Sequence, residues 1–472
     1  MSTRVNIAKL STGVPGLDEV IGGGLPELSF NLIAGGPGCG KTTLAHQIVF
    51  ANASPERPAL YITVVGEPPL KMLRYQQQYA FFDLSKVPGS IRFLHLGDVL
   101  VAGGLEAVLA AIVAEIERSR PRLVVVDSFR SVMRKAQEDG QLDIGHFVQR
   151  LALHLTSWEA TSFLVGEYVD HDDSNPLFSV ADGIFWLYQS VHRNTVIRKL
   201  QVLKVRGQSQ MPGLHTVAIN DAGVRVFPRA LPTVDGAHLQ AEAERRTSGT
   251  PALDVMLGGG IPEGYSILIA GPSGAGKTTL ATQFAVEGAA HGEPAVIAIF
   301  ERQPGDYLRV NARHRDIDAL IASGQLRIVY LRPLDLSIDE TLAEIRDAVA
   351  AIDARRVVLD SLSGFELALA AGFREDYRES LYRLVTLLTR LGVTVMMTAE
   401  MDAAPSSYGT PYGVSFLTDG IVLLRYHEVD GRIGRSLTVL KMRSSDHSRE
   451  VRVFEIGADG LVLGSRLGEA AG

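Results

Sequence analysis

Residues 271–280, G-P-S-G-A-G-K-T-T-L, decide the fold of this chain, because residues 35–44 repeat them closely as G-G-P-G-C-G-K-T-T-L. Both stretches fit the pattern G-x-x-x-x-G-K-[ST], in which glycines let backbone N–H groups close around phosphate oxygens. Each follows an apolar strand-like run and precedes a helix-like segment. We interpret both as phosphate-binding loops, because a chance match would not recur in the same strand–loop–helix context.

The repetition extends well beyond the two loops. Residues 11–28, S-T-G-V-P-G-L-D-E-V-I-G-G-G-L-P-E-L, match residues 247–264, T-S-G-T-P-A-L-D-V-M-L-G-G-G-I-P-E-G. Far downstream, L-K-V-R at 203–206 matches L-K-M-R at 440–443. The spacing between the two copies stays nearly constant along the chain, so the sequence is an internal duplication.

Each copy reads as an α/β domain. Short β-branched runs such as L-Y-I-T-V-V (60–65) and R-V-V-L-D (356–360) alternate with longer amphipathic stretches. This alternation is typical of a buried, mainly parallel sheet flanked by helices. We expect a first domain at residues 1–230, a linker at 231–246 where the apolar periodicity is lost, and a second domain at 247–472.

Composition limits the class of protein. The chain has 472 residues, 46% hydrophobic and 21% charged, with a formal net charge of −7. This is a soluble globular composition, and the acidic balance argues against a protein built to hold nucleic acid. Gly, Pro or charge interrupts the apolar runs before the roughly 18 residues of a membrane span, and the N-terminus lacks an apolar signal core. We expect a cytoplasmic protein with no membrane partner, and the single Cys39 excludes an internal disulfide.

The loops predict ATP and Mg²⁺ as cofactors. Lys41 and Lys277 are expected to reach the β- and γ-phosphates, and Asp127 and Asp360, each closing an apolar run, are expected to orient Mg²⁺ with the loop threonines Thr42 and Thr278. The residues expected to hold ATP are Gly36, Gly38, Gly40, Lys41, Thr42 and Thr43 in the first loop and Gly274, Gly276, Lys277, Thr278 and Thr279 in the second.

The two halves differ in the group that polarises the attacking water. In A-V-I-A-I-F-E-R (295–302) the second half has Glu301 at the end of a strand-like run. The aligned position of the first half is Val65, and the nearest glutamate is Glu67. Either a small bulge at Gly66 brings Glu67 into reach, or the first site binds ATP and hydrolyses it poorly.

A Lys-x-Arg motif closes each copy, as Lys204 with Arg206 and Lys441 with Arg443. Strand alternation places both cations of a pair on one face. They form either a solvated edge or, in a ring of such domains, cations that reach the γ-phosphate held by a neighbouring subunit. The repetition at matching positions favours the second reading.

In their order, these motifs resemble the KaiC family, the double-domain RecA-like ATPases of the cyanobacterial circadian clock and their relatives. The resemblance covers residues 8 to 465 and includes L-D, G-G-G, the phosphate loops, A-D-G or T-D-G, and L-K-x-R. It implies two tandem RecA-like P-loop domains, a homohexamer of two stacked rings with ATP at the subunit interfaces, and slow ATPase activity. It also implies serine/threonine autokinase and autophosphatase activity in the second ring, and a KaiB-like or signalling partner.

The sequence departs from the family pattern at several positions. The paired glutamates of the family fall on Glu301 and Arg302, so only the first is kept. The adjacent Ser-Thr phosphoacceptors fall on Ser415 and Phe416, which leaves phosphorylation of Ser415 alone, or a packed serine with no such role. The long C-terminal tail through which the family binds KaiA has no counterpart here, which argues against a KaiA-type partner.

Two other functional classes remain as alternatives. One is a DNA-handling RecA-family ATPase, against which the acidic balance counts. The other is a nucleotide-responsive scaffold in which ATP only joins subunits, and the absent first-half glutamate favours this reading for that ring.

Overall fold

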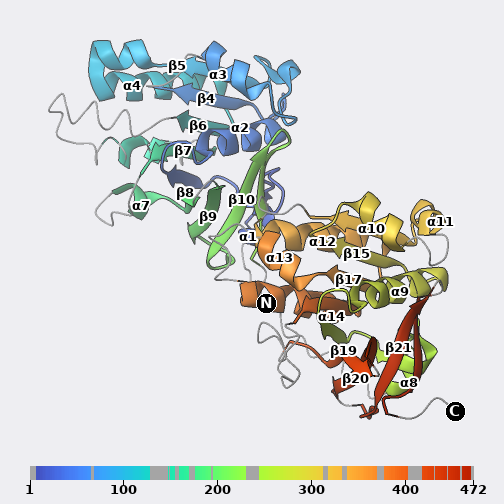
Figure 1. Cartoon of the computed structure of the whole chain (residues 1–472). Helices are drawn as coiled ribbons and strands as arrows, with labels where there is room; N and C mark the ends of the chain where they lie inside the picture. The colour runs from blue at the N-terminus through green and yellow to red at the C-terminus, as the bar shows by residue number, and fades with distance from the viewer. Residues whose placement is uncertain are drawn as a thin grey trace, which may run out of the picture. The chain divides into compact units, whose positions relative to one another are not determined.

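The computed structural model divides the chain into two compact units, Met1–Ala230 and Leu231–Gly472. Figure 1 colours the first from blue to green and the second from yellow-green to red. The structure describes residues 7–64, 69–127, 147, 149–151, 153–154, 159–168, 176–192, 195–229, 244–311, 317–331, 337–368, 377–401, 417–429, 431–443, 445–457 and 460–468.

The first unit is built on a nine-stranded sheet of order β11-β10-β9-β8-β3-β7-β6-β4-β5. The strands from β8 to β5 in this order are parallel, and β9, β10 and β11 extend the sheet antiparallel. The strands are β3 (Phe30–Gly35), β4 (Ala59–Thr63), β5 (Ile91–His95), β6 (Leu123–Asp127), β7 (Thr161–Glu167), β8 (Gly183–His192), β9 (Thr195–Val205), β10 (Leu214–Asn220) and β11 (Gly223–Phe227), with a separate pair β1 (Lys9–Leu10) and β2 (Leu25–Pro26). The described helices are α1 (Leu17–Val20), α2 (Lys41–Asn52), α3 (Pro69–Gln76), η1 (Leu84–Lys86), α4 (Gly97–Ser119) and α7 (Pro176–Val180).

The second unit repeats this topology strand for strand. Given from the opposite edge of the sheet, its order is β16-β15-β17-β18-β14-β19-β20-β21-β22, so that β16 corresponds to β5 and β22 to β11. Its strands are β14 (Ser266–Gly271), β15 (Ala295–Ile299), β16 (Leu326–Tyr330), β17 (Arg356–Asp360), β18 (Thr394–Glu400), β19 (Gly420–Val429), β20 (Arg432–Met442), β21 (Val451–Gly457) and β22 (Gly460–Arg466), beside the pair β12 (Arg245–Arg246) and β13 (Ile261–Pro262). Its described helices are α8 (Pro251–Met256), α9 (Lys277–Ala290), α10 (Pro304–Asn311), α11 (Ile317–Ala322), α12 (Ile338–Ile352), α13 (Leu362–Ala368) and α14 (Tyr377–Arg390). The predicted fold of two tandem RecA-like α/β domains is confirmed.

The strands are apolar on both faces because helices cover both sides of each sheet (Figure 1). In β3, Leu32 packs into one hydrophobic cluster with Val108 of α4. The next residue, Ile33, packs into the other cluster with Ile48 of α2. Successive side chains of a strand point to opposite faces, so one run of apolar residues supplies both cores.

Helix α4 is the one helix among the described residues that is long and apolar enough, by length and composition, to cross a membrane. Its backbone breaks at Gly104, where φ is 66°. Beyond the break, Val108, Leu109 and Ile112 are buried in the core of the first unit. A core helix of this kind passes the same test of length and hydropathy.

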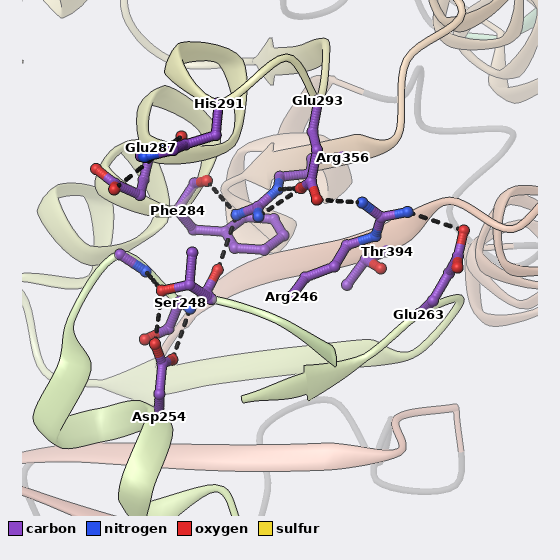
Figure 2. Close-up of polar contacts among 12 residues, drawn as sticks. Arg246, Ser248, Asp254, Glu263, Phe284, Glu287, His291, Glu293, Arg356 and Thr394 are labelled. Atoms are coloured by element: carbon purple, nitrogen blue, oxygen red, sulfur yellow. Dashed lines mark hydrogen bonds and ion pairs between the residues drawn. The ribbon is translucent and has the colours of Figure 1, made fainter. Parts of the chain in front are cut away.

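A charged side chain lies inside the second unit. Arg356, the first residue of β17, is 1% exposed and binds Glu293 through Nε at 2.6 Å. Its Nη1 donates to the carbonyl oxygens of Thr247 and Phe284, both at 2.8 Å. Figure 2 shows Glu293 between this guanidinium and that of Arg246, which lies 2.6 Å from the carboxylate. The network therefore ties the segment entering the unit to α9 and to a central strand.

Candidate functional site

The second phosphate loop connects β14 to α9. The strand is buried throughout, and the helix begins at Lys277 directly after Gly276, whose φ is 106°. A Cβ at Gly276 would lie 2.7 Å from Cδ1 of Ile456, so both backbone angle and space require glycine. Gly274 also has a positive φ, 74°. The loop therefore presents the first N–H groups of a helix, a ready site for an anion.

Lys277 lies folded against this loop. Its Nζ donates to the carbonyl oxygens of Gly271 at 2.9 Å and Pro272 at 2.8 Å. Burial lowers the pKa of Lys277, while carboxylates nearby, first that of Glu400, act in the opposite direction. The ammonium group thus lies at the loop, beside the position that phosphate oxygens take in a loop of this type.

The threonine and aspartate predicted to hold Mg²⁺ meet in both halves. Thr278 hydrogen-bonds Asp360, and burial raises the pKa of that carboxyl group. In the first half Oγ1 of Thr42 donates to Oδ2 of Asp127 at 2.9 Å. Burial likewise raises the pKa of Asp127, against the effect of hydrogen bonds that include one from Tyr61.

This donor set fits Mg²⁺ bound together with a nucleotide. Among the residues that the structure describes, no group of three or more His, Cys, Asp or Glu is arranged to hold a metal by itself. Mg²⁺ is commonly held by one or two carboxylates, with phosphate oxygens and water completing the shell. In each half, a threonine hydroxyl beside a buried carboxylate would supply the protein ligands of Mg²⁺.

A cavity of about 250 Å³ opens beside the second loop. Thr278 and Thr279 of the loop line it, together with Glu301, Tyr307, Asp360, Ser361, Glu400 and Ile456. Oε1 of Glu301 accepts a hydrogen bond from Oγ of Ser361 at 2.7 Å. The predicted water-polarising glutamate therefore faces the same space as the loop and the metal pair.

Sequence reasoning missed Glu400 and its counterpart Glu167. Each ends the strand next to the loop strand, with Glu400 opposite Gly271 and Glu167 opposite Gly35. Both strands were recognisable in the sequence, and a glutamate that closes each of them, 40 residues after Asp127 and Asp360 respectively, is the signal that could have identified the pair. Ser361 and Tyr307 carried no comparable signal.

The first loop has the same construction. Nζ of Lys41 donates to the carbonyl of Gly36 at 2.6 Å, and Gly38 and Gly40 have φ values of 73° and 101°. The thiol of Cys39 donates to the same carbonyl at 2.9 Å, and burial raises its pKa. Thr43, like Thr279 in the second loop, lies half-buried in the first turn of its helix.

Two predicted residues lie outside the part of the chain that the structure describes. Glu67 falls within 65–68 and Ser415 within 402–416. The first-half water-polarising group and the phosphoacceptor therefore stay predictions.

The Lys-x-Arg pairs lie beside the A-D-G and T-D-G turns of their own halves. Nζ of Lys204 donates to the carbonyls of Phe178 and Ser179 at 3.3 Å, and Arg206 pairs with Asp182 at 3.1 Å. In the second half Lys441 donates to the carbonyl of Thr418 at 2.6 Å, and Arg443 pairs with Asp419 at 3.4 Å. Neither Lys441 nor Arg443 lines the cavity of its own half.

Comparison with known proteins points to one family. The family described as "ATPase: KaiC" matches residues 10–230 and again residues 246–467. The circadian clock protein KaiC3 of Synechocystis sp. is 28% identical over 97% of this chain and 92% of its own length. The circadian clock oscillator protein KaiC of Synechococcus elongatus is 28% identical over 96% of this chain and 88% of its own.

Proposed function

Because this chain belongs to the KaiC family of ATPases, we propose that both phosphate loops bind Mg-ATP and that the second half is the main site of hydrolysis. The observation that carries the proposal is the cavity shared by Lys277, Asp360 and Glu301. ATP hydrolysis needs an anion cradle, a metal site and a group that polarises water. These three residues supply one of each.

In the proposed reaction the loop N–H groups and Lys277 bind the β- and γ-phosphates. Thr278 and Asp360 would hold Mg²⁺, which when bound neutralises charge on the transferred phosphoryl group. Glu301 holds and polarises the attacking water, because its carboxylate borders the cavity. Such a base contributes roughly a hundredfold to ten-thousandfold in rate.

The experiment compares ATP turnover of the full chain with that of Glu301→Gln and Glu67→Gln. We expect Glu301→Gln to lose most turnover, and Glu67→Gln to change it little if the first site hydrolyses poorly. Full activity in both variants would show that the water-polarising residues are wrongly assigned. Turnover that rises severalfold with single-stranded DNA would instead favour a DNA-handling ATPase.

We further propose that the chain forms an ATP-dependent homohexamer in which Lys441 and Arg443 act on the nucleotide of a neighbouring subunit. Their absence from the cavity of their own half supports this. Lys204 and Arg206 take the same part in the first ring. Mixing the inactive variants Lys277→Ala and Arg443→Ala tests the arrangement, because action across the interface restores part of the turnover and action within one subunit restores none.

For the first half, a role in holding the ring together is favoured by one observation. Val65 occupies the position that corresponds to Glu301. ATP at the first loop then joins subunits more than it is consumed. Lys41→Ala should shift the hexamer toward smaller species in light scattering with ATP present, whereas Lys277→Ala should not.

We also propose that the chain phosphorylates itself on a serine. The family pattern places one retained acceptor at Ser415. Mass spectrometry after long incubation with Mg-ATP should find phosphate on this residue, and Ser415→Ala is the control. A spectrum without it removes the kinase activity and leaves the ATPase.

Two relatives carry circadian clock names, so a KaiB-like or signalling partner in the cytoplasm is the partner class that we propose. A pull-down with and without ATP tests this. A set of bound proteins that does not change with nucleotide would contradict it.

A further inference from the structure

Ser361 holds Glu301 by a hydrogen bond whose direction is fixed. Its Oγ lies 2.7 Å from Oε1 of Glu301 and accepts the backbone N–H of Gly364 at 3.0 Å. A hydroxyl has a single O–H to donate. Because a carboxylate oxygen accepts hydrogen bonds, the Ser361 hydroxyl donates its proton to Glu301 while its own oxygen accepts the N–H of Gly364.

Gly364 leaves the space that Glu301 fills. A Cβ at this position would lie 2.6 Å from Cγ and 2.7 Å from Oε1 of Glu301. Gly364 is not among the glycines with a positive φ, so its backbone does not require glycine. The residue is small here because the glutamate packs against it.

Aromatic packing fixes the two elements that meet at this point. Phe300 precedes Glu301, Phe365 follows Gly364, and their ring centroids are 5.0 Å apart. Both rings are fully buried. The ring of Tyr377 also packs on Phe365, with the two ring centroids 5.6 Å apart. The end of β15 and the start of α13 are therefore packed against each other, and Glu301 follows directly after the buried Phe300.

The first half lacks this combination in its sequence. Counting from Asp127 as from Asp360, the position of Gly364 is Ser131, and the position of Glu301 is Val65. The chain thus pairs the glycine with the glutamate in the second half and has neither in the first.

We propose that Ser361 and Gly364 form a seat that orients Glu301 toward the cavity, and that this seat makes the second half the hydrolysing one. The inference rests on the proposed ATPase function. Ser361 and Gly364 are positioning residues, because they act through the glutamate. With Oε1 held by Ser361, Oε2 is the oxygen left to meet water.

The first test is a double-mutant cycle on the full chain with Ser361→Ala, Glu301→Gln and the double variant, measured as steady-state ATP turnover. Turnover of Lys277→Ala, in which the second loop is disabled, is the first-site baseline and is subtracted from that of every variant. Ser361→Ala should lower kcat roughly tenfold to a hundredfold with KM nearly unchanged, as expected for a misplaced catalytic group. Ser361→Thr, which keeps the hydroxyl, should recover most of it.

The double variant should be no slower than Glu301→Gln alone, because a seat without its glutamate has nothing to orient. Effects that multiply would mean that Ser361 acts independently, and the inference would be wrong. Loss of activity in Ser361→Ala through KM alone would also overturn it. Full turnover in Glu301→Gln is a different result, because it refutes the proposed site itself.

Gly364→Ala separates positioning from folding. Alanine favours a helix over glycine by about 1 kcal/mol, so the variant should be at least as resistant to heat as the wild type. Its kcat should nevertheless fall about tenfold, because Glu301 must move from its seat. Gly305→Ala is the matched control, since a Cβ at this helical glycine meets nothing within 4 Å. Unchanged kcat in Gly364→Ala would remove the glycine from the seat.

Discussion

Replacing Arg356 with leucine tests whether the buried ion network stabilises the second unit. The strand register gives the first unit Leu123 at this position, so the sheet accommodates leucine. The change takes a guanidinium from Glu293 and removes the hydrogen bonds that Nη1 donates to the carbonyl oxygens of Thr247 and Phe284. The loss therefore includes one ion pair and two hydrogen bonds from the side chain to backbone carbonyls.

The magnitude follows from the burial of these groups. Breaking a buried ion pair by removing one partner costs about 3–5 kcal/mol. Glu293 is 31% exposed and keeps Arg246, which places the cost at the lower end. The guanidinium also lies over the ring of Phe284, 4.6 Å from its centroid, and this cation–π contact is lost as well. We expect the free energy of unfolding to fall by about 3 kcal/mol, or Tm by about 6–12 °C for a unit of this size.

The chain offers a way to observe the two units separately. Its two tryptophans, Trp158 and Trp186, both lie in the first half. Tryptophan fluorescence therefore follows the first unit, whereas far-ultraviolet circular dichroism follows both. Arg356→Leu should lower the midpoint of the transition seen only by circular dichroism and leave the fluorescence transition in place.

Arg355→Ala is the matched control, because Arg355 pairs with Asp353 at the surface. Exposed pairs contribute under about 1 kcal/mol. A loss below about 1 kcal/mol in Arg356→Leu, or one no larger than in Arg355→Ala, would refute the reasoning.

Three further predictions follow from individual contacts. Burial alone would raise the pKa of Glu293, but the guanidinium groups around it lower the pKa below 4.5. The stability that the ionised Glu293 gives to the second unit is therefore present above pH 4.5 and lost as the pH falls through the lowered pKa. Glu293→Gln should destabilise the unit at pH 7 and not in strong acid. Gly276→Ala places a Cβ 2.7 Å from Ile456 at a φ of 106°, and should weaken fluorescent ATP-analogue binding to the second loop by roughly tenfold or more. Tyr61→Phe removes the 2.8 Å hydrogen bond to Asp127 and should cost the first unit about 1.5–3 kcal/mol, read by fluorescence.

Matched control variants test the second and third of these predictions. Gly292 has a similar φ of 80° but open space around it, so Gly292→Ala should leave analogue binding intact. Tyr188 donates to Gln201 at an exposed position, so Tyr188→Phe should cost under about 0.5 kcal/mol. Equal effects in test and control variants would show that the named contacts are not responsible. For Glu293→Gln, a loss that persists unchanged in strong acid would contradict the pKa argument.

The sequence alone predicted those parts of the site that lie on one continuous segment. The loops, Lys277 and Thr278 follow from a local spacing whose geometry the helix start imposes. Asp360 followed from its place at the end of an apolar run. The antiparallel extension β9 to β11 did not, because its strands were visible only as the Lys-x-Arg motif.

Contacts between separate strands could not be read in this way. Ser361 meets Glu301 because β15 and β17 are neighbours in the sheet, and strand order is not written in local periodicity. Gly364 looked like an ordinary helical glycine until the position of the glutamate was known. Arg356 reads in the sequence as a charged strand start, and its burial depends on an equally small Gly288, where a Cβ would lie 2.1 Å from Nε.

The thiol of Cys39 allows the first loop to be followed by a colour reaction that the second loop cannot give. It is the sole sulfhydryl in the chain, fully buried, and closed over by its bond to Gly36. A chromogenic thiol reagent reaches it only when that loop opens. The rate of colour development therefore measures how often the first loop opens, with no contribution from the second. Nucleotide bound at the first loop should slow this reaction, so occupancy of that loop can be followed in the unmodified protein without interference from the second loop.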